Sequence, residues 1–163
     1  MACAATPVTT AVVAGRGGYR DPRIADLPRC AYPSSRTSEW KIVVAPDREF
    51  AFRLPTDFAE VENPSGFIHG GKLWQRGKAT VSLQYGHWGL ESFAGAAEKC
   101  VSQVGDWETV VIRFQRESPS FVFWFVGSGP TGGHELIMGL NGERISDEAL
   151  LLSVGQSVFR AEP

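Results

Sequence analysis

An uninterrupted run of apolar residues from Phe121 to Val126 constrains the fold more than any other feature of this sequence. Successive side chains of a β-strand point to opposite faces of the sheet, so this run places apolar side chains on both faces. Such a strand is stable only where other elements cover both faces, which predicts a central strand in a layered domain. No apolar run approaches the roughly 18 residues that a membrane-spanning helix requires.

Alternating apolar and polar residues predict further strands around this central one. Residues 40–44 and 50–54 alternate on either side of the polar turn Pro46-Asp47-Arg48, which is typical of a β-hairpin. A loop is expected over residues 56–71, which contain Asn63-Pro64-Ser65-Gly66. The other predicted strands are residues 72–75, 79–85, 108–114 and 136–140, the last followed by a turn at Asn141-Gly142.

Two segments have the apolar spacing of helices. Between Leu90 and Val101 apolar residues recur every three or four positions, with Glu91 near the start and Lys99 near the end, as the helix dipole favours. Ser146 is the expected N-cap of a second helix. The apolar stripe of that helix consists of Leu150, Leu151, Val154 and Val158. The pattern therefore predicts an α+β domain, in which an antiparallel sheet has helices packed on it.

The chain length of 163 residues suits a single domain. Residues 1–38 contain scattered glycines and prolines and little regular alternation, so we expect a tether followed by an irregular extended segment. Residues 39–163 are expected to form the single α+β domain.

Two stretches of this domain resemble the PsbP-like fold family. Phe50-Ala51-Phe52-Arg53-Leu54-Pro55 resembles the second strand of its opening hairpin, which runs into a Leu-Pro pair. Ser153 to Phe159 resembles its closing helix and the Ser-aromatic pattern that follows. The resemblance covers residues 39–160 and implies an α/β/α sandwich, with helices on both faces of an antiparallel sheet. It also implies a non-catalytic accessory or envelope protein, and it carries over no functional residue.

The three cysteines, Cys3, Cys30 and Cys100, leave two interpretations open. In a cytoplasmic protein all three would be free thiols that serve as small packing residues. In an exported protein Cys30 and Cys100 could form a disulfide, which would stabilise the fold by roughly 4 kcal/mol on the chain-entropy model. None of the cysteines has the spacing of a zinc site.

Cys3 lies in the sequence Met1-Ala2-Cys3-Ala4-Ala5, which resembles a bacterial lipoprotein after the removal of its leader. In that class of protein a small apolar residue precedes a cysteine that carries the lipid anchor. The resemblance implies an exported protein that is periplasmic or anchored to a membrane only through an N-terminal lipid on Cys3. The alternative is a natural start with an ordinary cysteine in a cytoplasmic protein.

The charge balance argues against a nucleic-acid-binding protein. Lys plus Arg total 16 and Asp plus Glu total 18, which gives a net charge of −2. Proteins that bind nucleic acids mainly by charge carry a basic excess that neutralises phosphates. Because the cysteine placement favours export, the expected partner is an unknown protein or a component of the cell envelope.

Few residues suggest catalysis. His69, His87 and His134 each adjoin a glycine at a predicted loop end, and together with Glu135 they are candidate ligands of a metal ion. If the loops met, these residues could support a small metal-assisted hydrolase. The segment from Gly127 to Gly132 matches GxGxxG, but no βαβ unit surrounds it, so we interpret it as a glycine-rich loop and expect no cofactor.

The chain contains five tryptophans, and Trp74 and Trp88 are the two that flank a predicted strand next to loops. Exposed aromatic faces can stack on sugar rings or on partner side chains, so these two are candidate binding residues, although packing in the core is the commoner role. The first hypothesis is a non-catalytic, exported or envelope-anchored accessory domain. The alternatives are the metal-assisted hydrolase and a carbohydrate-binding module.

Overall fold

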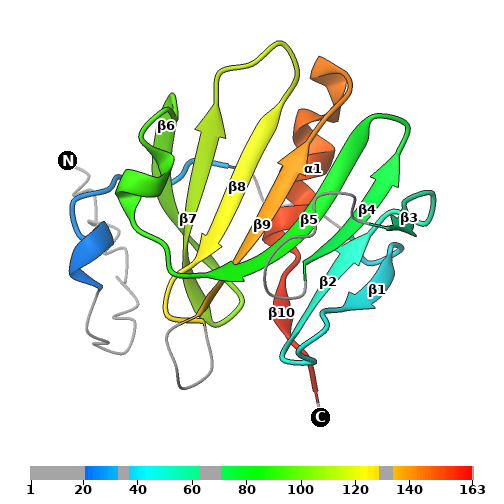
Figure 1. The fold of residues 1–163 in the computed structure, drawn as a ribbon, viewed down its shortest axis with the longest axis horizontal. Helices are drawn as coiled ribbons and strands as arrows, with labels where there is room; N and C mark the ends of the chain where they lie inside the picture. Colours follow the sequence, from blue (N-terminus) through cyan, green and yellow to red (C-terminus); the bar gives the residue numbers. More distant parts are fainter. Residues whose placement is uncertain (1–20, 33–36, 63–70, 129–133, 163) are drawn as a thin grey trace, which may run out of the picture.

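The chain is built around a seven-stranded antiparallel sheet. The computed structural model describes residues 21–32, 37–62, 71–128 and 134–162. The order of the strands in the large sheet is β3-β4-β5-β9-β8-β7-β6 (Figure 1). Its strands are β3 (Ala59–Val61), β4 (Lys72–Arg76), β5 (Ala79–Gly86), β6 (Glu98–Val104), β7 (Trp107–Phe114), β8 (Ser120–Phe125) and β9 (Glu135–Asn141).

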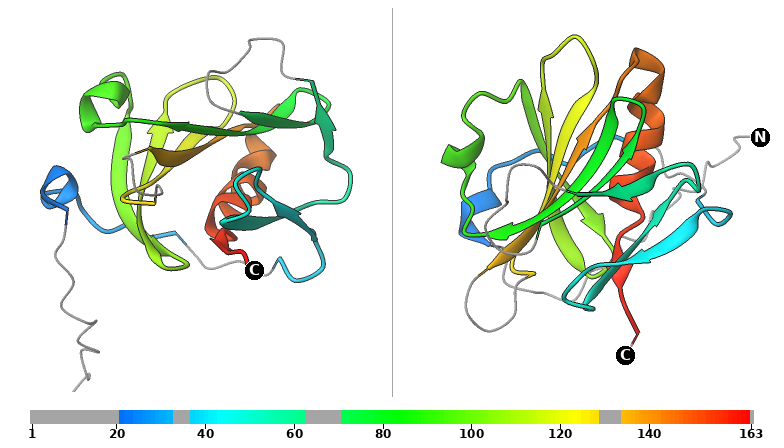
Figure 2. Two further views of the ribbon diagram at one scale, coloured as in Figure 1. Left: turned by 60° about the horizontal axis from the view of Figure 1, so that its bottom comes forward. Right: turned by 45° about the vertical axis from the view of Figure 1, so that its right-hand side comes forward.

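A smaller sheet and a single α-helix lie on one side of the large sheet (Figure 2). The small sheet has the order β1-β2-β10 and is also antiparallel. The helix α1 packs against β8 and β9 of the large sheet and against β2 of the small one. These elements are β1 (Lys41–Val44), β2 (Phe50–Leu54), β10 (Phe159–Arg160) and α1 (Glu148–Gln156).

The apolar run identified in the sequence does lie in a central strand with both faces covered. Phe121, Phe123 and Phe125 of β8 point toward α1 and the small sheet, where they join the larger hydrophobic core. Trp124 points to the opposite face and joins a second core that contains Ile24. Two cores, one on each face of the sheet, therefore cover the run, in which Val122 is half-buried and the other residues are buried.

The predicted hairpin and the strands around residues 72–75, 79–85, 108–114 and 136–140 are confirmed, with shifts of a residue or two at their ends. Two short strands were not predicted. β3 lies in the expected loop over residues 56–71, and β10 follows the C-terminal helix. Both are too short for alternation to distinguish them from a loop.

The predicted α/β/α sandwich is wrong, because the described residues are mostly β, with a single α-helix on one side of the large sheet. The helix expected between Leu90 and Val101 is replaced by a 3-10 turn, η2 (Leu90–Phe93), followed by strand β6. β6 pairs with β7 along its length, with Cys100 opposite Val111, so long-range pairing overrides the local helical spacing. On this far face, turns and an irregular segment take the place of a helical layer.

The C-terminal helix begins slightly later than predicted. Ser146 lies within a 3-10 turn, η3 (Ile145–Asp147), and the N-cap residue of α1 is Asp147 rather than Ser146. The Asp147 carboxylate instead accepts hydrogen bonds from the backbone N–H groups of Glu143 and Arg144, at 2.8 and 2.9 Å. These bonds hold the pKa of Asp147 below its usual value. They fix the turn that precedes the helix.

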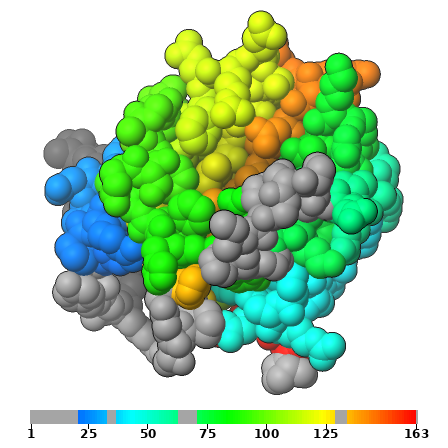
Figure 3. All heavy atoms as spheres, viewed as in Figure 1, coloured from blue at the N-terminus to red at the C-terminus, as the bar shows by residue number. Residues whose placement is uncertain are grey.

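The N-terminal segment is packed on the large sheet from residue 21 to residue 32. Its short turn η1 (Pro22–Ile24) places Ile24 in the second core, fully buried. Figure 3 shows this segment in blue beside the green atoms of the η2–β6 region. Next to β6, the Cys30 N–H donates to the Val101 carbonyl at 2.9 Å, and the Val101 N–H donates to the Pro28 carbonyl at 2.8 Å. The segment therefore covers the outer edge of β6.

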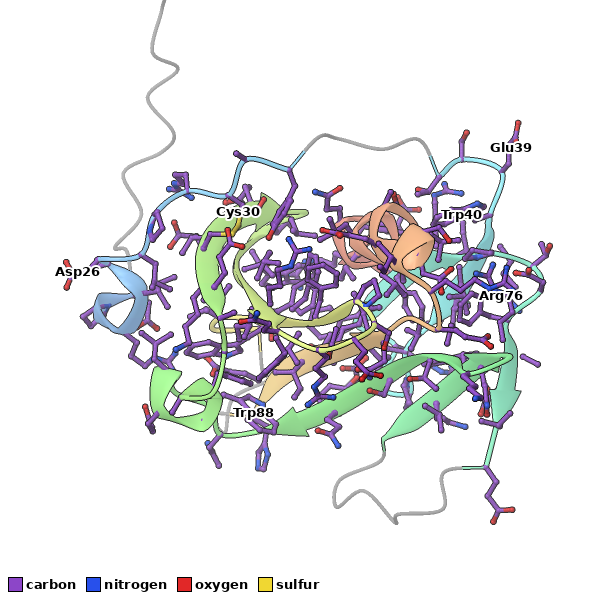
Figure 4. The ribbon with its side chains drawn as sticks, turned by 90° about the horizontal axis from the view of Figure 1, so that it is seen from above. Asp26, Cys30, Glu39, Trp40, Arg76 and Trp88 are labelled. Atoms are coloured by element: carbon purple, nitrogen blue, oxygen red, sulfur yellow. A yellow bond between two sulfur atoms is a disulfide. The ribbon has the colours of Figure 1, made fainter. Side chains whose placement is uncertain are left out.

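A disulfide joins Cys30 to Cys100 at this edge (Figure 4). Of the two interpretations that the sequence left open, the structure contains the bridged one. Cys3 lies outside the described residues. Among the described residues, no helix is long and apolar enough to cross a membrane.

Gly155 lies where α1 packs closely against β8, and its replacement tests that packing. A Cβ atom at this position would lie 2.5 Å from atoms of the Phe123 ring. We expect Gly155→Ala to lower the free energy of unfolding by about 1–3 kcal/mol, since overpacking displaces neighbouring side chains. Urea denaturation followed by circular dichroism measures the change. Gly95→Ala is the matched control, because a Cβ there meets nothing within 4 Å; an equal loss in both variants would contradict the packing.

Candidate functional site

Two adjoining hollows lie where α1 begins, and together they form the candidate site that we call the double hollow. The first has a volume of about 500 Å³. The second has a volume of about 350 Å³ and is bounded by the start of β6 and the turn between β7 and β8. The first hollow is lined by Tyr32, Ile145, Ser146, Glu148, Ala149, Leu152, Ser153 and Gln156. Ile145 and Glu148 line both hollows, so the two hollows are adjacent and share a wall.

Helix α1 and the disulfide-bonded segment place the walls of the first hollow. Ala149, Leu152 and Gln156 are spaced by three and four residues, so they lie on one face of α1. Tyr32 follows Cys30 by two residues and faces them from the N-terminal segment. The position of the opposite wall therefore depends on the disulfide that anchors this segment to β6.

Ile145 is the most exposed large apolar side chain in the described part of the chain, at 77%. The 3-10 turn before α1 holds it out of the core, at the boundary between the two hollows. An aliphatic side chain in this position provides a contact surface for an apolar ligand. The hollows are within the size range of ordinary ligand sites, roughly 300–1,000 Å³.

Two polar atoms of the first hollow have no hydrogen-bond partner within the described residues. They are the hydroxyl of Tyr32 and the side-chain oxygen of Gln156, and both are shielded from solvent. Burial raises the pKa of the Tyr32 phenol, and the Glu98 carboxylate raises it further, so the hydroxyl stays protonated at neutral pH. Leaving a buried polar group unpaired costs roughly 1–3 kcal/mol. A turn of each side chain toward the hollow would let a ligand with one acceptor and one donor remove that cost.

Some charged residues of the second hollow already contact other side chains of the chain. Arg113 forms an ion pair with Glu148 at the boundary between the hollows. The Arg116 guanidinium lies over the ring of Phe114, 5.4 Å from its centre. This wall is therefore polar at its rim and suits a ligand that remains partly in solvent.

The predicted metal ligands are only partly brought together. His87 and His134 follow and precede paired strands, and their ring centres lie 4.5 Å apart. His69 lies outside the described residues. Within the described ranges, no group of three or more His, Cys, Asp or Glu side chains is arranged to hold a metal ion.

Glu135, the fourth candidate ligand, belongs to a buried polar cluster instead. Its carboxylate accepts hydrogen bonds from the Arg23 guanidinium at 2.7 Å, the Trp124 indole N–H at 2.8 Å and the Gly127 backbone N–H at 2.7 Å. Both carboxylate oxygens bond to Arg23, which belongs to the N-terminal segment, so Glu135 holds that segment on the sheet. Arg23 also binds Asp21, and this contact holds the pKa of Asp21 below its usual value and raises that of Arg23.

The two candidate binding tryptophans are packing residues in this structure. Trp74 is buried and meets the ring of Phe52 edge-on, with 5.2 Å between the ring centres. Trp88 is half-buried on the side of the large sheet opposite α1 (Figure 4), where it stacks on Phe93. The Trp88 indole N–H donates to the backbone carbonyl of Glu135 at 3.1 Å. Neither residue lines the double hollow.

The residues of the double hollow did not stand out in the sequence. Tyr32 falls in the segment expected to be irregular, and Ile145 is an isolated apolar residue between Arg144 and Ser146. The only available signal was that isolation, because a large aliphatic residue among polar neighbours follows neither strand nor helix periodicity.

The comparisons with known proteins support the fold. No protein-family model matches the chain, and no curated protein sequence matches it. Among solved structures, the chain is similar to the solution structure of cyanobacterial PsbP (CyanoP) from Synechocystis sp. PCC 6803. The TM-score is 0.53 and the sequence identity is 9%, over 79% of this chain and 96% of the other. The resemblance to the PsbP-like fold seen in the sequence is thus supported at the level of the fold.

Proposed function

We propose that this chain is a non-catalytic, exported accessory domain that binds an extended peptide segment of a partner protein in the double hollow. The observation that carries the proposal is the pairing of an apolar wall with the unpartnered Tyr32 hydroxyl and Gln156 oxygen. A hydroxyl donates and a carboxamide oxygen accepts, and a peptide group offers one C=O and one N–H. A peptide also brings apolar side chains, which suit the wall formed by Ile145 and Leu152.

The export part of the proposal rests on the disulfide. Structural disulfides form and persist in oxidising compartments and are rare in the cytosol. The Cys30–Cys100 bridge is consistent with such a compartment. The likeness to cyanobacterial PsbP adds the fold of that protein and nothing about its location. The lipid on Cys3 stays a prediction, which the mass of the N-terminal peptide from naturally expressed protein checks.

The binding part is tested with a phage-displayed library of random 12-residue peptides. Selection is carried out against the full chain in the presence of excess Ala149→Arg protein, which fills the first hollow with a long charged side chain. Ala149 is exposed, so this variant is expected to fold. We expect the enriched peptides to share one large apolar position and to bind at least tenfold more weakly to Ala149→Arg.

A second variant separates the hydrogen bond from the apolar contact. Tyr32→Phe removes only the hydroxyl, and a net hydrogen bond of about 1 kcal/mol predicts a loss of roughly fivefold in affinity. Ala59→Arg, at an exposed position of β3, is the matched control and should leave the affinity unchanged. Failure to enrich any peptide, or equal binding to Ala149→Arg, would overturn the proposed function.

A further inference from the structure

Strand β1 has one edge that no described strand covers. The small sheet has the order β1-β2-β10, so β1 pairs with β2 on one side only. Figures 1 and 2 show β1 at the outer border of the molecule, away from the large sheet. Uncovered edges present backbone donors and acceptors that can pair with a strand of another chain.

The hydrogen-bond pattern shows which residues of β1 present these groups. The Ala45 N–H donates to the Phe50 carbonyl at 2.8 Å, so residue 45 bonds toward β2. In an antiparallel pair the residues that bond to a given neighbour alternate, so the backbone groups of Ile42 and Val44 point away from β2. Arg53 lies opposite Ile42 and gives the same assignment. Its backbone N–H and C=O bond to the Ser157 hydroxyl on the far side of β2, so they do not bond to Ile42.

The same two residues expose their side chains. Ile42 is 54% exposed and Val44 is 53% exposed, and with Ile145 they are the exposed large apolar side chains of the described residues. Natural edge strands usually carry a lysine or another charge that discourages pairing. The lysine of β1 does not serve this role at the edge, because the Lys41 ammonium group binds the backbone carbonyl of Phe58. β1 thus combines backbone groups that no described strand pairs with β-branched apolar side chains at two alternate positions.

We propose that β1 pairs with β1 of a second copy of this chain, antiparallel and with the two-fold axis at Val43. In this register Ile42 of each copy faces Val44 of the other, and each such pair exchanges two backbone hydrogen bonds. The two small sheets then form one six-stranded sheet, since each contributes three strands.

The self-complementarity of the strand favours a second copy over a different partner. In the symmetric register the two exposed apolar side chains, Ile42 and Val44, face each other, and the same two residues supply the outward-facing backbone groups, so one edge provides both halves of the contact. The register places Lys41 opposite Ala45 of the second copy, so no like charges face each other within the strand. The contact does not involve the double hollow and is independent of the proposed peptide binding.

The first test is the molar mass of the full chain in solution. Sedimentation equilibrium should show a mass that rises from 17.8 kDa toward twice that value as the concentration increases from about 10 µM to about 1 mM. A single strand pair makes a small interface, so the dimer is weak and forms only at high concentration. Val44→Lys should abolish this rise, since it places two ammonium groups beside an apolar contact. Ile145→Lys, which removes the other exposed aliphatic side chain, is the matched control and should leave the rise unchanged.

The second test reads the register directly by disulfide formation. In a Cys3→Ser background, Val43→Cys places two thiols across the two-fold axis, where the Cα atoms are about 4.5 Å apart and within the range for a disulfide. Val44→Cys faces Ile42 instead and should cross-link much more slowly. Any of three results would overturn the proposal. They are a mass of 17.8 kDa at every concentration, equal effects of Val44→Lys and Ile145→Lys on the mass, and equal cross-linking at positions 43 and 44.

Discussion

Replacing both Cys30 and Cys100 by serine is expected to lower the free energy of unfolding by about 4 kcal/mol. The bridge closes a sequence separation of 70 residues, and the entropy of such a loop in the unfolded chain accounts for an effect of this size. Two-state globular domains are stable by about 5–15 kcal/mol, so the loss is a large share of the total. Urea denaturation of the two proteins at neutral pH measures it directly.

Two further measurements make this result specific to the bridge. Cys3→Ser leaves the Cys30–Cys100 bridge intact and serves as the control. The double variant should also speed hydrogen exchange at the Cys30 and Val101 amides, whose backbone bonds the bridge holds in place. A loss below 1 kcal/mol with unchanged exchange would show that the backbone pairing holds the segment without the bridge.

Replacing Glu135 by alanine is expected to lower the free energy of unfolding by about 3–5 kcal/mol, because it removes one partner of a buried ion pair. Its carboxylate is the acceptor for Arg23, for the Trp124 indole and for the Gly127 backbone, and its side chain is only 6% exposed. The variant leaves the indole and backbone donors without this acceptor, while Arg23 retains Asp21 as a charged partner. Thermal and urea denaturation together measure the loss.

The matched control for this prediction is an exposed ion pair of the same chemistry. Glu60 pairs with Lys72, but its side chain is 51% exposed, so Glu60→Ala should cost less than about 1 kcal/mol. Glu135→Gln should fall between the two, because the amide keeps one acceptor but turns an N–H₂ group toward a donor. Equal losses for Glu135→Ala and Glu60→Ala would contradict the anchoring role of Glu135.

The elements that could be predicted from the sequence are those whose pattern reflects their own burial. β8 is apolar on both faces, and the hairpin of β1 and β2 alternates around a clear turn, so both were predicted. The stretch from Leu90 to Val101 was not, because apolar residues three and four apart also occur by chance in a strand such as β6. Its true pairing partner, β7, and the disulfide to Cys30 decide its structure, and neither contact has a local signature.

The candidate site was less accessible to prediction than the fold. Its walls come from Tyr32, the turn after β7 and the outward face of helix α1, which are far apart in the sequence. The histidines and Trp88 were predicted as site residues because imidazole and indole side chains are chemically distinctive. Trp88 lies on the face opposite α1 and lines neither hollow, so a distinctive residue type does not identify which surface is hollow.

The strand order has a consequence for how this chain can be made. β9 lies between β5 and β8, and β10 completes the small sheet beside β2, so both sheets need residues close to the C-terminus. A ribosome that has released only the first two thirds of the chain has therefore supplied neither closing strand. Neither sheet is complete until residues 135–160 have been synthesised, so the last strands to be made are the ones that close both sheets.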